Sequence, residues 1–374
     1  MRILHIVPSY KPAYIYGGPI ESVARLCESL ARAGHAVDVF TTTANGKSEL
    51  DVMPGKQVDI DGVSVTYFSR LTKDPTHISP ALWRRLYRRC GEYDVIHIHS
   101  WWNILVLAAA MICHKKKAKV IISPRGMLSE YILANSKTGV KKLLHELTGR
   151  KQLSEARFHA TSQGEYEECV RLIPGWKGFV LPNIITLPDL PLEKSNNVVF
   201  TLVFLSRVHP KKGVELLLNA ISDLPFRVML RIAGSGEAAY IAKLKESVNT
   251  LGISEMVEWV GWKGREEKFL ELVKADLFVL TSFNENFANT VIESLHMGTP
   301  VLISEAVGLA SFVKEKDLGW VTSLDIDSIK VNLINAFYDR EKRMMINATG
   351  RQIIGDAFSE EILIEKYVHA YETL

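Results

Sequence analysis

The sequence has little cysteine and no long run of apolar residues. Its 374 residues include four cysteines, none of them in a Cys-x-x-Cys pair, so it predicts neither a disulfide framework nor a zinc site and fits a reducing compartment. The longest apolar run, Ile104 to Cys113, is too short to span a bilayer, and the apolar run near the start is shorter than the core of a signal peptide. These absences predict a cytoplasmic protein.

Internal repeats and low-complexity segments are also missing. We find no repeat with a period of roughly 20 to 50 residues and no biased tract. A hydrophobic content of 47% with 23% charged residues indicates a globular protein rather than a disordered one. A chain of 374 residues is long enough for two domains, each with its own core.

Charge is distributed unevenly along the chain, although the net formal charge is only +3. Residues 1–187 contain 25 Lys and Arg against 16 Asp and Glu, a net of +9, and the remainder contains 20 against 26, a net of −6. Net charges of opposite sign in the two halves favour two domains. A polar, proline-containing stretch from Pro182 to Asn197 resembles an interdomain linker, so we expect domains at 1–187 and 188–355 and a terminal helix at 356–374.

The first half begins with a pattern typical of a Rossmann-like unit. Residues 2–7 form a short apolar run that predicts a buried strand, Gly17 and Gly18 lie in the following loop, and a helix is expected through about residue 33. The two glycines could let a ligand approach the backbone, or they could simply make a tight turn. The sequence leaves both interpretations open.

Two further groups follow predicted strands of this half. The strand at 94–99 places His97 and His99 on the same side, which would suit a metal site. Because no third ligand is near in sequence, we instead expect His97 to be partly buried and His99 to line a crevice at the strand end. Arg125 follows the strand at 120–124, so it also lies at a carboxyl end.

In the second half, a loop rich in cations follows a strongly apolar strand at 198–205. Arg207, Lys211 and Lys212 could neutralise a pyrophosphate without a metal, or they could be ordinary surface charge. Gly234 belongs to a Gly-x-Gly that lacks the third glycine of a dinucleotide-binding motif. It is therefore only weak support for a nucleotide site.

The stretch from Thr281 to Pro300 carries the most specific pattern. It follows a buried strand at 275–280, places Glu285 in the loop past that strand, and predicts a helix that begins near Phe287 with Asn286 as its N-cap. In open α/β sheets, ligands bind beyond the carboxyl ends of the strands. Glu285 is therefore a candidate for ligand contact.

The expected helix would add polar groups on one face and free N–H groups at its start. Asn289, Glu293 and His296 are spaced to share a face, and the backbone N–H groups of residues 287–290 would suit a phosphate. The alternative is that Glu285 and Glu293 are solvated carboxylates near an ordinary amphipathic helix.

Three of these features together match one enzyme family. With Glu285-x7-Glu293, the basic loop at Arg207 and Lys212, and the glycine pair at 17–18, the sequence resembles the family 4 retaining glycosyltransferases over essentially its whole length. The resemblance implies the α/β fold called GT-B, in which two Rossmann-like domains face each other across a cleft and a C-terminal helix crosses back to the first domain.

The resemblance also implies an activity and residue roles. It implies transfer of a hexosyl group from a nucleotide sugar, bound by the C-terminal domain, to a glycan or lipid-linked acceptor in surface polysaccharide synthesis. By the same resemblance, Glu285 contacts the hydroxyls of the donor sugar, Glu293 contacts the ribose, and the two basic residues contact the diphosphate. Further donor-binding candidates are Gly18, Gly234, Asn286, Phe287, Ala288 and Asn289, and the acceptor or cleft candidates are Gly17 and His99.

One position departs from the family pattern. Many relatives have a histidine, in a sequence such as Thr-Pro-His-Gly, where this chain has Ser123-Pro124-Arg125-Gly126. A guanidinium cannot act as a base near neutral pH, but it could stabilise the charge of a leaving group. We therefore count Arg125 with Glu285, Arg207 and Lys212 as a catalytic candidate, and carry no histidine role over to His99.

No metal or other cofactor is expected. We interpret the two Asp-x-Asp segments, at 59–61 and 325–327, as turns, and fixed cations could stabilise a departing diphosphate in place of a metal. Two alternatives to glycosyl transfer are a sugar-nucleotide epimerase of the same fold and a protein that binds nucleotide sugars without catalysis. The sequence does not identify the base or the sugar of the donor.

The positive charge of the first half suggests an anionic partner. Four arginines alternate with apolar and aromatic residues at 82–89, and a second basic helix is expected around Lys141 and Lys142. A polyprenyl-diphosphate-linked acceptor at the inner face of the cytoplasmic membrane would fit, and high salt should weaken such binding. We expect no nucleic-acid partner. The competing interpretation is that the basic residues only keep the domain soluble.

Overall fold

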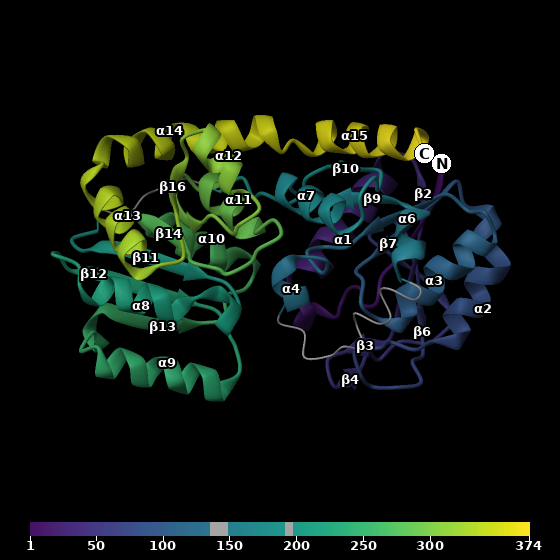
Figure 1. Cartoon of the computed structure of the whole chain (residues 1–374), viewed down its shortest axis with the longest axis horizontal. Coiled ribbons are helices and arrows are strands. Elements are labelled where there is room, and N and C mark those ends of the chain that lie inside the picture. Colours follow the sequence, from purple (N-terminus) through teal and green to yellow (C-terminus); the bar gives the residue numbers. More distant parts are fainter. Residues whose placement is uncertain (135–148, 191–196) are drawn as a thin grey trace. The chain divides into compact units, whose positions relative to one another are not determined.

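The computed structural model describes residues 1–134, 149–190 and 197–374. The described chain divides into two compact units, residues 1–186 together with 360–374, and residues 187–359 (Figure 1). The chain passes to the second unit at Leu187 and returns to the first at Glu360. The predicted basic helix around Lys141 and Lys142 lies outside the described residues, as does part of the expected linker.

The N-terminal unit is built on one large sheet. In its described residues, eight strands follow the order β10-β9-β8-β7-β1-β2-β6-β5, and all neighbours are parallel except β5 and β6. The strands are β1 (Arg2–Ile6), β2 (Ala36–Thr42), β5 (Gln57–Ile60), β6 (Val63–Phe68), β7 (Val95–His99), β8 (Val120–Ser123), β9 (Arg157–Ala160) and β10 (Gly178–Val180), with a hairpin of β3 (Ala44–Asn45) and β4 (Ser48–Glu49) beside them.

Helices cover both faces of this sheet. They are η1 (Tyr14–Tyr16), α1 (Gly18–Arg32), α2 (Pro80–Arg89), η2 (Cys90–Glu92), α3 (Ile104–Lys115), α4 (Glu130–Ala134), α6 (Arg150–Ser154), α7 (Gln163–Leu172) and α15 (Glu360–Glu372). The helix expected at 356–374 is therefore split, because α15 begins at Glu360 and residues 356–357 end the preceding helix.

The two faces of the N-terminal sheet differ in polarity, because side chains alternate along each strand. Even-numbered residues such as Leu4, Ile98 and Ile122 belong to one apolar core with α2, α3, α6 and α7. Odd-numbered residues include buried histidines, which face α15. One face is thus a conventional hydrophobic core and the other a buried polar layer.

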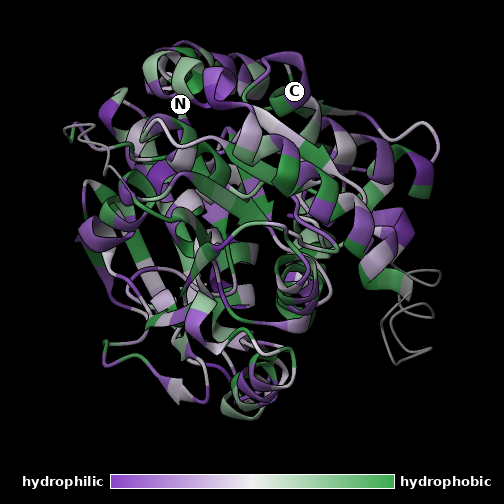
Figure 2. Cartoon of the chain, turned by 90° about the vertical axis from the view of Figure 1, so that its left-hand side faces the viewer, coloured by the Kyte–Doolittle hydropathy of each residue, from purple (hydrophilic) through white to green (hydrophobic). Residues whose placement is uncertain are grey.

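The C-terminal unit contains a parallel sheet of a different order. Its described strands run β13-β12-β11-β14-β15-β16, which is the doubly wound order of a Rossmann fold. They are β11 (Phe200–Leu205), β12 (Val228–Ala233), β13 (Val257–Gly261), β14 (Leu277–Leu280), β15 (Val301–Ser304) and β16 (Gly319–Thr322). In Figure 2 the strands are largely in the hydrophobic colour, as expected for a sheet covered on both faces.

The helices of the C-terminal unit connect these strands in sequence, except α13 and α14, which follow the last strand. They are η4 (Pro210–Lys212), α8 (Val214–Ser222), α9 (Ala238–Thr250), η5 (Ser254–Met256), α10 (Arg265–Lys274), α11 (Asn289–His296), α12 (Ala310–Glu315), α13 (Ile326–Tyr338) and α14 (Arg340–Ala357). The alternation of strand and helix produces the right-handed crossovers of parallel sheets, and it places every strand's carboxyl end at the same edge.

The interpretation of the Asp-x-Asp segments as turns is confirmed only in part, because Asp61 lies in the turn between β5 and β6. Asp59 lies in β5, where it pairs with Ser64, and only Asp61 has the positive φ of a turn residue. Asp325 is the N-cap of α13 and accepts a hydrogen bond from the backbone N–H of Ser328, so Asp327 lies in the first turn of that helix. Both segments are therefore explained by local secondary structure.

Candidate functional site

The candidate site in the C-terminal unit lies where its strand order reverses. β11 and β14 are neighbours, but the chain leaves β11 towards β12 and β14 towards β15. The loops after both strands meet: the N–H of Phe283 donates to the carbonyl of Lys211 at 2.8 Å, and the hydroxyl of Thr281 donates to the carbonyl of Gly213 at 2.9 Å. Such a reversal is the usual ligand position in open α/β sheets.

Gly213 is required for this close approach. Its φ is +63°, and a Cβ atom built there would lie 2.1 Å from the carbonyl oxygen of Thr281. A larger residue would therefore push the cationic loop and the loop after β14 apart. The glycine that follows Lys211 and Lys212 is thus explained by backbone contact between two loops.

Lys212 and Glu285 form an ion pair between these two loops. Both side chains are largely shielded from solvent, and the backbone of Glu285 is fixed because its N–H donates to Ala306 and its carbonyl accepts from Gly308. The structure thus brings together two residues that the sequence predicted separately. A fixed ammonium beside a fixed carboxylate can hold a phosphate oxygen and a sugar hydroxyl, respectively.

The helix after Glu285 does not begin where the sequence predicted. α11 begins at Asn289, not near Phe287, and its N-cap is Ala288 in a left-handed conformation with φ of +66°, not Asn286. Phe287 is buried and its ring lies 6.1 Å from the ring of Phe358. The buried ring and the left-handed residue turn the chain before the helix can start, which spacing alone could not reveal.

The expected polar face of this helix is largely internal. Glu293 is buried, and its carboxylate lies 2.7 Å from the ammonium of Lys268 on α10. His296 donates from Nε2 to the carbonyl of Pro188 at 2.8 Å, and burial lowers its pKa. Asn289 is half-buried in the first turn. The ion pair with Lys268 was missed because no pattern connects the two positions.

Arg207 and Gly234 lie at the same edge of the sheet. Arg207 is exposed in the loop after β11. A Cβ atom at Gly234 would lie 1.9 Å from the carbonyl oxygen of Ser206, and the N–H of Val208 donates to Ser235 at 2.8 Å, so the loops after β11 and β12 are in backbone contact. Packing explains Gly234 whether or not it touches a ligand.

The four candidates of the N-terminal unit lie near carboxyl ends of its strands or at the start of α1. Gly17 is the N-cap of α1 with φ of +73°, which favours glycine, whereas a Cβ at Gly18 would meet no atom within 4 Å. The tight-turn interpretation therefore explains Gly17. Gly18 has no such structural reason within the described residues.

Arg125 carries a charge without an acidic partner among the described residues. Its φ is +53°. Nε donates to Nδ1 of His99 at 3.3 Å, and Nη1 donates to the hydroxyl of Ser22 at 3.0 Å and to Oδ1 of Asn183 at 3.2 Å. All three acceptors are neutral, and burial lowers the pKa of the guanidinium. Such a cation is costly to bury and is suited to an anion.

His99 was expected to line a crevice and His97 to be partly buried, and both expectations were wrong. Neither ring is accessible to solvent. Because Arg125 donates to Nδ1 of His99, the proton of His99 must be on Nε2, which donates to Nδ1 of His5 at 2.8 Å. Burial and the nearby arginine lower the pKa of His5 to about 3, so this chain of rings is neutral.

A second chain of hydrogen bonds ends on the C-terminal helix. Nε2 of His159 donates to the carbonyl of Leu181 at 2.8 Å, so its Nδ1 accepts from Ser123 at 2.6 Å. The hydroxyl of Ser123 then accepts from Nε2 of His97 at 2.6 Å, and Nδ1 of His97 accepts from the hydroxyl of Tyr371 at 2.8 Å. The direction of every hydrogen bond in this series therefore follows from the carbonyl of Leu181, which can only accept.

The third histidine that a metal site would need is His5, far away in sequence. One ligand atom from each of His5, His97 and His99 lies within 4.8 Å of the others. However, each ring already uses its unprotonated nitrogen to accept from His99, Tyr371 and Arg125, respectively. A metal would have to break these hydrogen bonds beside a guanidinium, so the cluster is better explained as a structural network.

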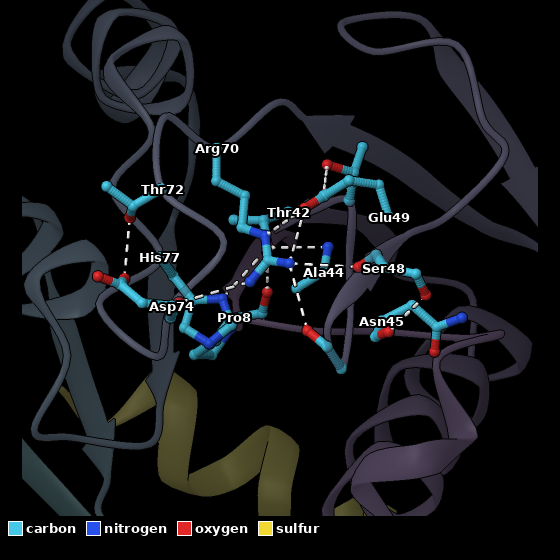
Figure 3. Close-up of polar contacts among 12 residues, drawn as sticks. Pro8, Thr42, Ala44, Asn45, Ser48, Glu49, Arg70, Thr72, Asp74 and His77 are labelled. Carbon is cyan, nitrogen blue, oxygen red and sulfur yellow. Dashed lines mark hydrogen bonds and ion pairs between the residues drawn. The ribbon is translucent and has the colours of Figure 1, made fainter.

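Arg70 connects loops at the same edge of the N-terminal sheet, and no sequence pattern predicted this role. Its Nε and Nη2 donate to Glu49 at 2.9 and 2.7 Å, and Nη2 also donates to the carbonyl of Ser48 at 3.2 Å (Figure 3). Nearby, Asp74 accepts from Thr72 at 2.9 Å. The buried guanidinium thus connects the β3–β4 hairpin to the loop after β6.

Family comparisons agree with this architecture. The family described as "Glycosyl transferases group 1" matches residues 192–353, and the "Glycosyl transferase 4-like domain" matches residues 17–183. The two matches fall on the two structural units and together account for most of the chain. This protein belongs to the GT-B glycosyltransferases of the family 4 type.

Relatives of this glycosyltransferase cover nearly its whole length. It is 25% identical to an uncharacterized glycosyltransferase of Methanocaldococcus jannaschii, over 100% of this chain and 98% of the relative. It is 27% identical to the alpha-monoglucosyldiacylglycerol synthase of Streptococcus pneumoniae, over 85% of this chain and 74% of the relative. The predicted family membership is confirmed.

Solved structures confirm the fold of the glycosyltransferase. HepE of Anabaena, determined in complex with UDP and glucose, aligns with a TM-score of 0.73 at 18% identity, covering 100% of each chain. The predicted pair of Rossmann-like domains is therefore correct. In the part of the glycosyltransferase that the structure describes, no helix is both long and apolar enough to cross a bilayer.

Proposed function

We propose that the glycosyltransferase moves a hexosyl group from a nucleotide sugar to a glycan or lipid-linked acceptor in surface polysaccharide synthesis, with retention of configuration at the anomeric carbon. The observation that carries the proposal is the ion pair of Lys212 and Glu285 at the strand reversal of the C-terminal sheet. The solved relative with UDP and glucose supports a nucleotide-sugar donor.

The donor is held by groups at one edge of the C-terminal sheet. Arg207 and Lys212 neutralise the diphosphate, Glu285 accepts hydrogen bonds from the sugar hydroxyls, and the backbone from residue 286 to Asn289 approaches the sugar and phosphates. The first N–H groups of α11 add partial positive charge. Glu293 contacts the ribose, and Lys268 holds its carboxylate in place.

The reaction breaks the bond between the anomeric carbon and the diphosphate oxygen and forms a bond from that carbon to the acceptor oxygen. The proton of the acceptor hydroxyl passes to the leaving phosphate on the same face of the sugar. Fixed cations stabilise the departing charge without a metal. Arg125, whose hydrogen-bond partners are all neutral, replaces the family histidine as a further stabiliser of that charge.

The acceptor is recognised by the N-terminal unit, with Gly17 and Gly18 at the start of α1. The net charge of +9 over residues 1–187 favours an anionic acceptor such as a polyprenyl-diphosphate-linked sugar. The name of the pneumococcal relative, alpha-monoglucosyldiacylglycerol synthase, supports a lipid-linked acceptor. The protein then works in the cytoplasm, at the inner face of the membrane.

Donor screening tests this proposal. A ligand that binds only the native state raises the melting temperature, so one of the UDP-, GDP- or ADP-sugars should raise it and the others should not. The selected donor should then yield an acceptor-dependent glycoside. An epimerised free sugar would support the epimerase, tight binding without turnover would support a non-catalytic protein, and no stabilisation by any donor would contradict all three.

A further inference from the structure

Helix α3 is apolar on all sides, although one of its sides faces outward. Residues 104–113 contain no charged side chain. Leu105, Val106 and Ala109 are buried in the core, whereas Ile104 and Met111 remain 39% and 46% exposed. Ile104, Ala108 and Met111 follow each other at i, i+4 and i+7, so they form one outward stripe. A helix that is hydrophobic all round is normally buried in protein or lipid.

The neighbouring helix α2 adds cations to this stripe. Both helices pack into the same core through Leu82, Leu86 and Leu105, so they lie side by side on one face of the sheet. On the outward face of α2, Arg84, Tyr87 and Arg88 are exposed at i, i+3 and i+4, and the end of α3 exposes Lys115, Lys116 and Lys117. The ammonium of Lys116 lies 3.9 Å from the centre of the Tyr87 ring, which joins the two helices.

Negative charge is scarce around the described part of this surface, where Glu155 contacts His114 near the end of α3 and also Lys151. Neither helix contains an Asp or Glu, and neither does the segment from Lys116 to Lys119. Glu92, which follows α2, is ion-paired with Arg2 and Arg89. An apolar stripe beside uncompensated cations has the composition of helices that lie in the interface of anionic membranes.

We propose that the α2–α3 face docks on an anionic bilayer; its residues are Arg84, Tyr87, Arg88, Ile104, Ala108, Met111, Lys115, Lys116 and Lys117. Ile104, Met111 and Tyr87 enter the headgroup region, and the cations contact lipid phosphates. Cations alone would be enough to bind a nucleic acid, so the apolar stripe favours a bilayer. The proposal rests on the proposed lipid-linked acceptor and names the surface that brings the enzyme to it.

The structure separates the four arginines of 82–89 into two classes. Arg85 donates to the carbonyl of Gly55 at 3.0 Å and lies over the ring of Phe68, and Arg89 donates to Glu92 at 2.9 and 3.0 Å. These two are engaged within the protein. Only Arg84 and Arg88 belong to the docking surface, so replacing all four arginines would confuse folding with binding.

Co-sedimentation of the full chain with vesicles tests the proposal. The wild-type protein should bind vesicles of phosphatidylglycerol and phosphatidylcholine but not phosphatidylcholine alone, and high salt should weaken binding. The double variant Arg84→Ser/Arg88→Ser should bind roughly 25-fold more weakly, because each cation near an anionic bilayer contributes roughly a fivefold change. The control Lys243→Ser/Arg340→Ser removes two exposed cations of the C-terminal unit and should bind like wild type.

The apolar stripe has its own variant and control. Ile104→Ser/Met111→Ser should reduce binding at low salt while all cations remain, and Met344→Ser, an exposed methionine of α14, should not. Equal binding of wild type to both vesicle types would overturn the proposal, as would unchanged binding of Arg84→Ser/Arg88→Ser or of Ile104→Ser/Met111→Ser. Self-association that these same substitutions abolish would also overturn it. Donor-induced thermal stabilisation reports the proposed function separately, and it should be unchanged in all these variants.

Discussion

At the scale of single residues, the account depends on cations and carboxylates that two loops hold in fixed positions. Lys212 differs from Arg207 in its surroundings, because Lys212 is buried beside Glu285 whereas Arg207 is exposed. Replacing either residue should remove a phosphate contact, but the effect on the free energy of unfolding should differ between the two positions.

Lys212→Ala and Arg207→Ala should each weaken binding of the nucleoside diphosphate by about 1.5–3 kcal/mol, the size of a charge-assisted hydrogen bond. Only Lys212→Ala should also lower the free energy of unfolding, since it leaves the carboxylate of Glu285 without its cation. Calorimetric titration and urea unfolding measure the two effects. Lys243→Ala, an exposed lysine of α9, is the control; wild-type affinity in both variants would remove these residues from the phosphate.

Gly213→Ala and Gly18→Ala should separate packing from ligand contact. At Gly213 the new Cβ would overlap the carbonyl of Thr281 in a left-handed backbone, so we expect a loss of at least about 2 kcal/mol in unfolding free energy. At Gly18 the Cβ meets nothing within 4 Å, so stability should change by less than about 0.5 kcal/mol while transfer falls. If both variants unfold alike, the packing argument is incorrect.

At the scale of elements, α15 is fixed to the N-terminal sheet by a directed chain of hydrogen bonds rather than by apolar contact alone. Tyr371 donates to His97, and Tyr367 donates to the carbonyl of Pro182 at 3.0 Å. At the start of the same helix, Glu360 accepts from Arg25 at 2.6 Å and from Ser29 at 2.7 Å. Both ends of α15 are thus held by polar groups of its own unit.

Tyr371→Phe should destabilise the N-terminal unit by about 1–3 kcal/mol, because it removes the hydroxyl that donates to Nδ1 of His97 and leaves that buried acceptor unsatisfied. Tyr338→Phe is a suitable control, since that side chain is 69% exposed. Urea unfolding followed by tryptophan fluorescence would give both values. Equal stability of the two variants would show that the hydrogen bond is replaced by other contacts.

Acid should destabilise the same unit. Burial lowers the pKa of His5 and His159 to about 3 and that of His77 to about 4, whereas the unfolded chain binds these protons near pH 6.5. Stability is therefore highest above pH 6.5 and falls with decreasing pH by up to about 1.4 kcal/mol per unit for each histidine. Unfolding measured at pH 7 and pH 5 should show this loss, and a flat profile would mean the rings are protonated when folded.

At the scale of the whole molecule, the sequence predicted most strands and the two-domain organisation because short apolar runs bounded by glycine and polar loops are local signals. The strands expected at 94–99, 120–124 and 275–280 are observed as β7, β8 and β14, with bounds that differ by at most two residues. The predicted start of α11 was wrong because a buried phenylalanine and an alanine in the left-handed conformation determine where the helix begins. Periodicity carries no information about either.

The residues of the candidate site could be predicted from the sequence only where they belong to one local motif. The spacing of Glu285 and Glu293 is local, but the cation paired with each carboxylate, Lys212 or Lys268, comes from another element. The buried histidine layer was invisible for the same reason, since His5 and His99 are 94 positions apart. The function of a motif depends on which polar groups its residues contact in the folded protein. These contacts cannot be predicted from a single sequence.

The central claim is that the groups around Glu285 carry out retaining glycosyl transfer without a metal. Product analysis with the selected donor and a lipid-linked acceptor, in the presence of EDTA, tests it most directly. We expect a glycoside with the anomeric configuration of the donor from wild type, and no product from a folded Glu285→Ala variant. Inverted product, activity that requires added magnesium or manganese, or near wild-type turnover by the variant at saturating donor would contradict the account.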